Sequence, residues 1–461
     1  MIRTTLIGLI AALIVAVAAF GGTEASYFAI SQITLLALSI LLLLFYRPSP
    51  GVELKLPVWI PLLLVSLILL QTVPLPLSVI QFLGGKATAG VAGPLVPISF
   101  APYETIFNLM ILISCFAAFY LTIVVCQRHS NGKPLIFALL ALGTFEAGYG
   151  LFQYFTEWAQ AASYTKADSF LGASGTYVNR NHFAGLMEMI FPFALVLAYG
   201  QFQKIREEQP EFGAGIRDFF KHEDFHKLIL WLSLAILLFV ALVFSQSRMG
   251  IISAVASTLV LSALVLTSGW QRTNAALVIV LFLIAAVAAV NWIGPEPVVG
   301  RFQSLSQEYG HMGPNRLSFW MDTTRLIRDH PLLGSGLGTF PVDYPIEQTS
   351  YARAFVGHAH NDYLEFASEM GLPCALLFFT AIFSLLLRGI RHVRNSEPGF
   401  GRMIFLGSFG GLIAILIHSL ADFNLHIPAN GLLFAVLLGM LYASISQHGA
   451  ENRKLARSSV R

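Results

Sequence analysis

The sequence predicts an all-α protein that crosses a membrane about twelve times. Residues of the set AVILMFWYC make up 56% of the 461 residues, and charged residues make up only 11%, whereas a soluble domain carries about 25%. So little charge cannot cover the surface of a soluble globule, and so much apolar content excludes intrinsic disorder. The formal net charge of +3 does not suggest nucleic-acid binding. The remaining class is a polytopic membrane protein in a lipid bilayer.

A helix needs about 20 mainly apolar residues to cross the hydrocarbon core of a bilayer. Segments of this kind recur along the chain, at residues 4–20, 28–46, 57–80, 104–126, 134–156, 182–202, 228–245, 249–267, 274–293, 363–387, 403–421 and 429–446. Pro74 and Pro76 predict that the third segment is broken or re-entrant at its outer end. The first segment resembles a signal peptide, but we expect it to be kept as an anchor helix.

The positions of Lys and Arg predict the orientation of the spans. With the N-terminus in the cytoplasm, 19 of the 28 Lys and Arg residues fall in inner segments, and five of the others lie in one long outer loop. Long loops count little in this rule. We therefore expect cytoplasmic N- and C-termini in a plasma membrane. We divide the chain into N-terminal transmembrane helices (1–174), a core (175–447) and a basic cytoplasmic tail (448–461).

The long outer loop, residues 295–361, is expected to fold in part. Its apolar residues predict an amphipathic helix from Asn315 to Asp329, which His330 and Pro331 end. The sequence HPLLGSGLGTF follows, with glycines at 334, 336 and 338. This spacing favours a simple flexible turn, with an anion-binding backbone nest as the alternative. It is not a P-loop, since Thr339 and Phe340 follow the last glycine.

Three arginines are predicted to lie on the outer side. Arg180 lies in YVNRNHFAG before the sixth span, and Arg248 lies in SQSRMG between two spans. Arg180 is interpreted as part of an interfacial cap with a snorkelling side chain. Arg248 is either a structural residue of the turn or, because a guanidinium binds phosphate oxygens in pairs, an anion ligand. Arg316 and Trp320 lie four residues apart in RLSFW. A cation–π pair is the structural interpretation of that spacing.

Ionisable residues cluster most densely in GHAHNDYLEFASEMG, residues 357–371. Two histidines, His358 and His360, precede Asn361, which begins the next helix. Asp362, Glu365 and Glu369 then follow on one helix face. One histidine suits a general base because imidazole titrates near neutral pH; the alternatives are a structural hydrogen-bonding histidine and, less favoured, a zinc ligand.

Two further polar groups are predicted to support this end of the bundle. HSLADFNLHIPAN places His418 and Asp422 one helical turn apart, with His426 in the outer turn that follows. We interpret this segment as support for the site or as a lock on the bundle. Glu146, Gln153 and Glu157 form another polar stripe near the outer end of the fifth span.

In combination these motifs resemble the O-antigen ligase/polymerase family of bacterial membrane proteins. The matching pieces are SQSRMG, RLSFW, HPLLGSGLGTF, HNDYLEFASEMG and DFNLHIPAN, together with their order, the single large outer loop and about twelve spans. The likeness is best over residues 175–445. It implies a fold like that of the GT-C glycosyltransferases and a glycan donor on undecaprenyl pyrophosphate. It also implies transfer on the periplasmic side without a metal or other cofactor.

The resemblance also implies roles for individual residues. By position, the catalytic histidine of the family corresponds to His360, and its essential arginines correspond to Arg248 and Arg316, with Arg180 as a further pyrophosphate ligand. The expected supporting residues are His358, Asn361, Asp362, Glu365, Trp320 and Asp422. The acceptor is expected to be lipid-linked, such as lipid A–core for a ligase.

The residues themselves agree with this chemistry but leave alternatives open. Transfer from a lipid pyrophosphate develops negative charge on the leaving group, which arginines can neutralise in place of a metal. The motifs do not separate a ligase from a polymerase. A proton-coupled transporter that uses Glu146, Glu365 and Glu369 is the alternative from another class. A non-catalytic assembly subunit is the third possibility.

Overall fold

A computed structural model describes residues 1–47, 57–82, 94–127, 129–156, 172–208, 222–267, 316–349, 355–395 and 399–458. Within these ranges nine helices are long and apolar enough to cross a membrane. They are α2 (Ala25–Phe45), α5 (Pro102–Val125), α6 (His129–Thr156), α8 (Arg180–Glu208), α10 (Phe225–Phe244), α11 (Arg248–Thr267), α18 (Leu372–Asn395), α19 (Phe400–His418) and α20 (Pro428–Ser458). Two shorter apolar helices are α1 (Ile2–Ala18) and α3 (Trp59–Thr72). The chain is therefore a polytopic, all-α membrane protein.

The predicted spans agree well with these helices. Each of them except 274–293 overlaps one or two helices of the structure, and segment 274–293 lies outside the described residues. The expected break in the third span is confirmed: α3 ends at Thr72, and a short β-strand, β1 (Leu75–Pro76), follows. This strand pairs antiparallel with β2 (Leu95–Val96), and helix α4 (Leu77–Phe82) lies between the two strands.

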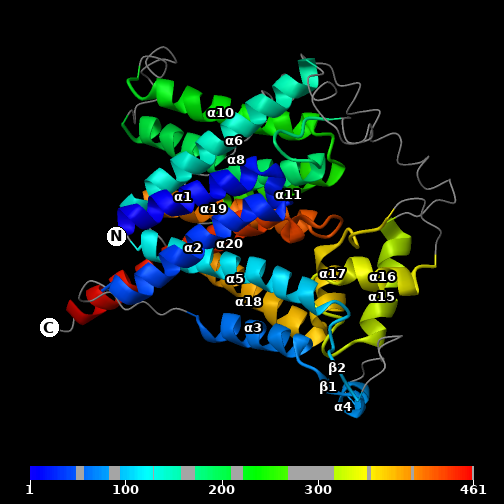
Figure 1. The fold of residues 1–461 in the computed structure, drawn as a ribbon. Helices are drawn as coiled ribbons and strands as arrows, with labels where there is room; N and C mark the ends of the chain where they lie inside the picture. Colours follow the sequence, from blue (N-terminus) through cyan, green and yellow to red (C-terminus); the bar gives the residue numbers. More distant parts are fainter. Residues whose placement is uncertain are drawn as a thin grey trace.

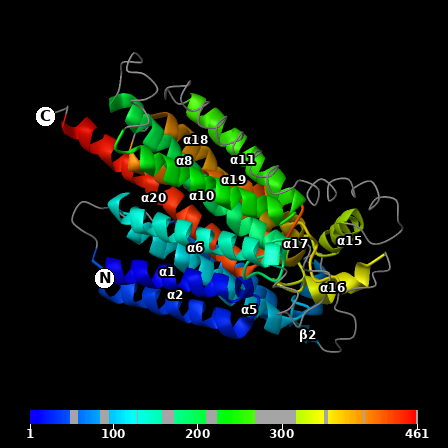
Figure 2. The same ribbon diagram turned by 90° about the horizontal axis from the view of Figure 1, so that it is seen from above.

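The bundle has α8 at its centre. The whole apolar window of α8 is buried, and the helix packs against α6, α10, α11 and α19. Helix α5, from the N-terminal part of the chain, packs against α20. Figures 1 and 2 show both chain ends at one end of the bundle and α15, α16 and α17 at the other. The outer loop and the first turn of α8 therefore meet at the end opposite the chain termini.

The predicted amphipathic helix is present as α15 (Arg316–Asp329). It packs against α16 (Phe340–Glu347) through the buried carboxylate of Asp322, which accepts hydrogen bonds from the Tyr344 hydroxyl (3.1 Å) and the Thr349 hydroxyl (2.7 Å). Leu326 joins a small apolar core with Phe340 and Tyr344. The described part of the outer loop is thus a packed layer over the end of the bundle.

The tenth predicted span is broken, which the sequence pattern did not indicate. A nine-residue helix, α17 (Asp362–Met370), ends at Gly371, and α18 begins at Leu372. Gly371 has a φ of 77°, and a Cβ atom there would lie 2.3 Å from the carbonyl oxygen of Leu332. The backbone of Pro331 accepts a hydrogen bond from Leu372 (2.9 Å). The break exists because the loop after α15 occupies the space between α17 and α18.

The same contact corrects the prediction of a flexible turn in HPLLGSGLGTF. Gly334 has a φ of 68°, and a Cβ atom there would lie 2.2 Å from the carbonyl oxygen of Glu369. The backbone amides of Ser335 and Gly336 donate to Ser368 and Glu369, each at 3.0 Å. Gln71 also donates to Glu369 (2.7 Å). These glycines therefore let a buried loop approach the end of α17 closely.

Candidate functional site

The candidate site forms where three segments meet at the loop end of the bundle. These segments are α15, residues 355–361 with the start of α17, and the turn between α19 and α20 with its 3₁₀-helix η3 (Asn424–His426). Figure 1 shows α15, α16 and α17 side by side at this end. Asn361 accepts a hydrogen bond from the Leu364 amide (3.1 Å) and caps α17. The cap fixes the direction in which the preceding histidines enter the site.

Asp422 is the buried centre of the site. Its side chain is 1% exposed, and its Oδ2 lies 3.6 Å from Nη2 of Arg316. Its Oδ1 lies 3.6 Å from Nδ1 of His360 and 4.0 Å from Nε2 of His182. The guanidinium of Arg316 also donates to the backbone oxygen of Ala421. The structure thus brings the predicted Arg316, His360 and Asp422 together.

The charge of Asp422 follows from these neighbours. Burial alone would raise the pKa of the carboxyl group, but the adjacent His360 and the positive charge of Arg316 outweigh burial and hold its pKa well below its usual range. Asp422 is therefore a carboxylate at neutral pH. A fixed negative charge beside Nδ1 is the arrangement that orients an imidazole ring and stabilises it when it takes up a proton.

His360 is held in an unusual backbone conformation. Its φ is 52°, in the left-handed region that is uncommon for residues other than glycine. The indole of Trp320 donates a hydrogen bond to the backbone oxygen of His360 (3.3 Å), so Trp320 positions this residue. The ring centroids of Phe423 and Phe319 lie 4.9 and 6.1 Å from that of His360, and the histidine remains 28% exposed. The ring is thus fixed on one side and accessible on the other.

Asp362 supports the site without facing His360. Its Oδ2 accepts hydrogen bonds from the Ser419 hydroxyl (2.6 Å) and the Leu425 amide (3.1 Å). Its own amide donates to the backbone oxygens of Ser419 (3.0 Å) and Asp422 (3.2 Å). Asp362 therefore fixes the turn that carries Asp422, and Asp422, not Asp362, is the carboxylate beside the His360 ring.

A second group of ionisable side chains lies beside the first. His358 Nδ1 lies 2.6 Å from Glu365 Oε1, and His426 Nδ1 lies 2.6 Å from Asp362 Oδ1. Burial opposes a charged imidazole, but Glu365 and Asp362 raise the pKa of His426 well above its ordinary value. The His358 ring stacks on Phe423 at 3.9 Å, so Phe423 separates this group from His360.

Arg180 and Arg248 each begin a helix at this end of the bundle. Arg180 is the first residue of α8, two residues before His182. Arg248 is the first residue of α11, and Gly250 packs against Ala184 of α8. Both arginines are half-buried. Among the contacts described above, Arg316 is the arginine that meets Asp422, whereas Arg180 and Arg248 begin α8 and α11 at this end of the bundle.

Some of the other predicted polar residues are held elsewhere. Glu146 accepts hydrogen bonds from the amide (2.9 Å) and hydroxyl (3.0 Å) of Thr176. It therefore belongs to a contact between α6 and the segment before α8, apart from Glu365 and Glu369. Gln153 lies on α6, and Glu157 lies outside the described residues. His418 contacts Glu188 (3.0 Å), not Asp422 as its spacing suggested.

Sequence reasoning missed Glu188 and gave His182 too little weight. The Glu188–His418 pair lies fully buried between α8 and α19. The available signal was a single carboxylate inside a long apolar run, which membrane energetics makes expensive unless it is paired. Asn430 adds a link, since it donates to the His182 carbonyl (2.9 Å) and accepts from the Tyr177 hydroxyl (2.8 Å). These contacts attach the start of α8 to the turn that carries Asp422.

The comparison with known families agrees with the motifs. The sequence model of the O-antigen ligase family matches residues 233–379. This segment of the chain is similar to the O-antigen ligase family. The match supports the O-antigen ligase/polymerase family, so the resemblance found in the sequence is confirmed. No curated protein matches the chain.

The matched segment covers only part of the candidate site. It includes Arg248, Arg316 and the segment from His358 to Glu369. His182 and Asp422 lie outside the matched residues, on either side of them in the sequence. His182 comes from the first turn of α8 and Asp422 from the turn before α20, and the fold brings Asp422 within 4.0 Å of His182 and 3.6 Å of His360.

Proposed function

We propose that this protein is a ligase-type glycosyltransferase of the bacterial inner membrane. It moves a glycan from undecaprenyl pyrophosphate to a lipid-linked acceptor, such as lipid A–core, at the periplasmic face. The reaction inverts the sugar configuration and needs no metal at the reacting atoms. In this orientation both termini lie in the cytoplasm, which agrees with their place opposite α15 in Figure 1.

One observation carries the proposal: a buried Asp422 carboxylate lies 3.6 Å both from Nδ1 of His360 and from Nη2 of Arg316. It combines a candidate general base and a candidate anion ligand around one fixed charge. The base is partly exposed while the carboxylate is buried, so a substrate can reach the imidazole but not the group that orients it. This is the arrangement that proton abstraction beside a charged leaving group requires.

The reaction can be followed atom by atom. Nε2 of His360 takes the proton of the acceptor hydroxyl while that oxygen attacks the anomeric carbon of the donor glycan. The bond from this carbon to the pyrophosphate oxygen breaks, and undecaprenyl pyrophosphate leaves with the electron pair. One displacement inverts the anomeric centre. Asp422 stabilises the imidazolium, and general-base catalysis of this kind contributes about 10²–10⁴-fold.

The arginines are assigned to the pyrophosphate. Arg316 already lies beside the carboxylate, 39% exposed, so part of its guanidinium can face a ligand. Arg248 and Arg180 begin helices at the same end of the bundle, where the helix dipole adds to their positive charge. Together they supply the positive charge that a leaving diphosphate needs.

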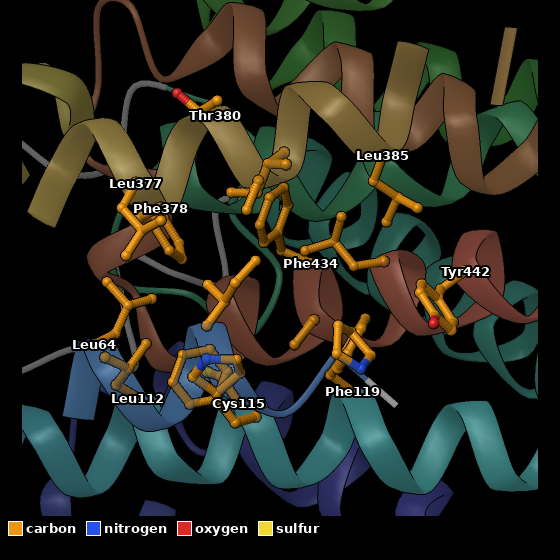
Figure 3. Close-up of a pocket in the computed structure, with 18 of the residues that line it drawn as sticks. Leu64, Leu112, Cys115, Phe119, Leu377, Phe378, Thr380, Leu385, Phe434 and Tyr442 are labelled. Atoms are coloured by element: carbon orange, nitrogen blue, oxygen red, sulfur yellow. The ribbon is translucent and has the colours of Figure 1, made fainter. Parts of the chain in front are cut away.

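An apolar cavity of about 350 Å³ lies next to the site and suits the lipid tail of the donor. It is lined by α3, α5, α18 and α20, with Leu112, Phe378 and Phe434 among its residues (Figure 3). Phe366 of α17 also lines it and stacks on His426 at 4.1 Å. The cavity therefore extends from the polar cluster into the bundle, as a lipid with a polar head and a hydrocarbon chain requires.

Transfer by the purified protein tests the proposal. The full chain in detergent is incubated with an undecaprenyl-pyrophosphate-linked glycan, a lipid-linked acceptor and EDTA. We expect product in EDTA, and loss of about 10²-fold or more with His360→Ala. Full turnover by His360→Ala would exclude the assigned base, and loss of transfer on chelation in a protein that keeps its Tm would exclude the metal-independent reaction. Saturable uptake into proteoliposomes without any glycan product would favour a transporter instead.

Complementation separates the ligase from the polymerase. The gene is expressed in a ligase-null and in a polymerase-null strain, and the length distribution of the surface glycan is read. Restored attachment of glycan to lipid A–core supports the ligase. Restored laddering supports the polymerase of the same family.

A further inference from the structure

Three buried side chains converge on a small gap between α17 and the turn before α20. Nε2 of His426 lies 3.6 Å from Glu365 Oε1 and 3.7 Å from Glu369 Oε2. All three atoms lie within 4.8 Å of one another. The side chains of Glu365 and Glu369 are 1% exposed and that of His426 is 9% exposed. The function proposed above does not use these atoms.

Two of the three atoms have no hydrogen-bond partner. Nε2 of His426 and Oε2 of Glu369 are both buried and unsatisfied in the structure. A buried polar group without a partner costs about 1–3 kcal/mol, and more when it is charged. Both side chains are more than nine-tenths buried, and both atoms point to the same gap. A ligand bound between these two atoms would satisfy both of them.

The opposite atoms of all three side chains are fixed by neighbours. Nδ1 of His426 lies 2.6 Å from the carboxylate of Asp362. Oε2 of Glu365 accepts from the Ala359 amide (2.8 Å), and Oε1 of Glu369 accepts from the Phe340 amide (3.1 Å). Metal-binding histidines usually donate their second ring N–H to a carboxylate, and metal-binding carboxylates are likewise held by hydrogen bonds. The three side chains are held in the way that ligands of a metal are held.

The distances between the three atoms suit ligands of one metal ion. A hydrogen bond from Nε2 to a carboxylate is about 2.7–3.2 Å long, so at 3.6 and 3.7 Å the imidazole and the two carboxylates lie within ion-pair distance, with room between them. Zinc binds nitrogen and oxygen at about 2.0–2.2 Å, which in a tetrahedron places two ligands about 3.3–3.6 Å apart. The observed distances lie at or just above the upper end of this range.

We propose that His426, Glu365 and Glu369 bind one divalent transition-metal ion of the Zn²⁺ or Mn²⁺ class, which pins α17 to the turn that carries Asp422. One imidazole and two carboxylates favour these metals over Mg²⁺ and Ca²⁺, which take mostly oxygen ligands. Because a metal binds the neutral imidazole, the ion takes the place of the proton that Glu365 and Asp362 favour on His426. It is not at the reaction centre, since the rings of His358 and Phe423 lie between this site and His360.

A second trio, Glu208, His222 and Asp224, also brings three such atoms together. It does not need a metal, because Lys204 and Lys227 each lie 2.5 Å from the Asp224 carboxylate and already neutralise it. Glu208 is also 47% exposed. The experiment must therefore exclude weak metal binding at this second trio.

Metal analysis of the purified full-length protein tests the proposal. The detergent-solubilised chain is stripped with a chelator, loaded with Zn²⁺, desalted and measured by inductively coupled plasma mass spectrometry. We expect about one zinc per chain, about a tenfold lower content in Glu369→Gln, and unchanged content in two controls. Glu188→Gln removes another buried carboxylate that lies beside a histidine. Glu208→Gln removes one carboxylate of the second trio, Glu208, His222 and Asp224.

Loading the wild-type protein with Co²⁺ keeps the test independent of how well any variant folds. We expect the visible absorption of Co²⁺ in a tetrahedral nitrogen and oxygen site, displaced by Zn²⁺, and a higher Tm with either ion than in the stripped protein. A wild-type chain that retains neither ion and keeps its Tm would overturn the proposal. So would zinc that is lost in Glu208→Gln and kept in Glu369→Gln. Because these measurements use no substrate, their result does not depend on whether the protein transfers a glycan.

Discussion

The indole of Trp320 donates a hydrogen bond to the backbone oxygen of His360, whose φ is 52°. This contact ties α15 to the residue assigned as the base, and it holds that residue in a backbone conformation which costs about 1–3 kcal/mol when nothing supports it. The helix therefore does more than cover the end of the bundle. It fixes the base through the main chain and leaves the ring accessible.

Removing this hydrogen bond is expected to slow transfer without unfolding the protein. A neutral hydrogen bond contributes about 0.5–1.5 kcal/mol, so Trp320→Phe should lower kcat/KM about 3- to 10-fold. Trp231→Phe is the matched control, because Trp231 lies in α10 and stacks on Phe137. Equal rates for the wild type and Trp320→Phe would show that the indole does not position His360.

Asp422 is expected to act through its charge. Asp422→Asn keeps the shape of the side chain but removes the carboxylate between His360 and Arg316, so kcat should fall about 10²-fold or more. Because the pKa of Asp422 is well below its usual range, the wild-type carboxylate is ionised throughout the range from about pH 5 to pH 8. The loss is therefore expected at every pH in that range, measured as initial rates of transfer. Glu347→Gln, an acidic position on α16, should retain activity; a variant Asp422→Asn as active as this control would contradict the assignment.

The carboxyl group of Asp343 on α16 should lower the free energy of unfolding as the pH rises. Burial raises its pKa to about 6, above the value of about 3.9 in an unfolded chain. Below about pH 4 both states hold the proton; between about pH 4 and pH 6 only the folded state keeps it, so each step up in pH favours unfolding. Above about pH 6 both states are ionised, and the destabilisation stays near 3 kcal/mol as an upper limit.

The variant Asp343→Asn removes this titration. We expect its Tm to exceed that of the wild type at pH 8 and to equal it near pH 4, measured by thermal unfolding in detergent across the pH range. A difference in Tm that is the same at both pH values would show that Asp343 does not titrate in this way.

The break between α17 and α18 should depend on the absence of a side chain at Gly371. In Gly371→Ala a left-handed backbone must carry a Cβ atom, and that atom meets the Leu332 carbonyl. The two effects together should cost about 2–5 kcal/mol. Gly148→Ala is the control, since nothing lies within 4 Å of a Cβ there and the position is inside α6; it should be neutral or stabilising by up to about 1 kcal/mol. The measurement is the Tm of both purified variants, and equal values would contradict the strain at Gly371.

Much of the fold was predictable because a membrane imposes a simple rule on sequence. A long apolar run such as the one that forms α10 predicts a membrane-spanning helix. The spacing of apolar residues likewise predicted the amphipathic helix α15. The break at Gly371 was not predictable from hydropathy, because apolar residues continue on its far side. It follows from a long-range contact with Pro331 and Leu332, which no local pattern contains.

The candidate site was predictable in its residue types and less so in their pairing. Arg316, His360 and Asp422 were all identified from the sequence, but the i, i+4 spacing paired Asp422 with His418 instead of with His360. A spacing rule describes neighbours on one helix, and Asp422 lies in a turn after the last residue of α19. Its partners come from α15 and from the segment before α17, which only the fold brings together.

The bonds of Asp362 to Ser419 and Leu425 impose an order on how the protein is made. Residue 362 leaves the ribosome long before residues 419 and 425 do, so α17 must wait, without its partners, until α19 has been inserted and the following turn has emerged. A nascent chain arrested before residue 419 therefore contains α15, α16 and α17 but lacks the residues to which Asp362 is bonded. The contacts of Asp422 with Arg316 and His360 can therefore form only after the chain beyond α19 has been made.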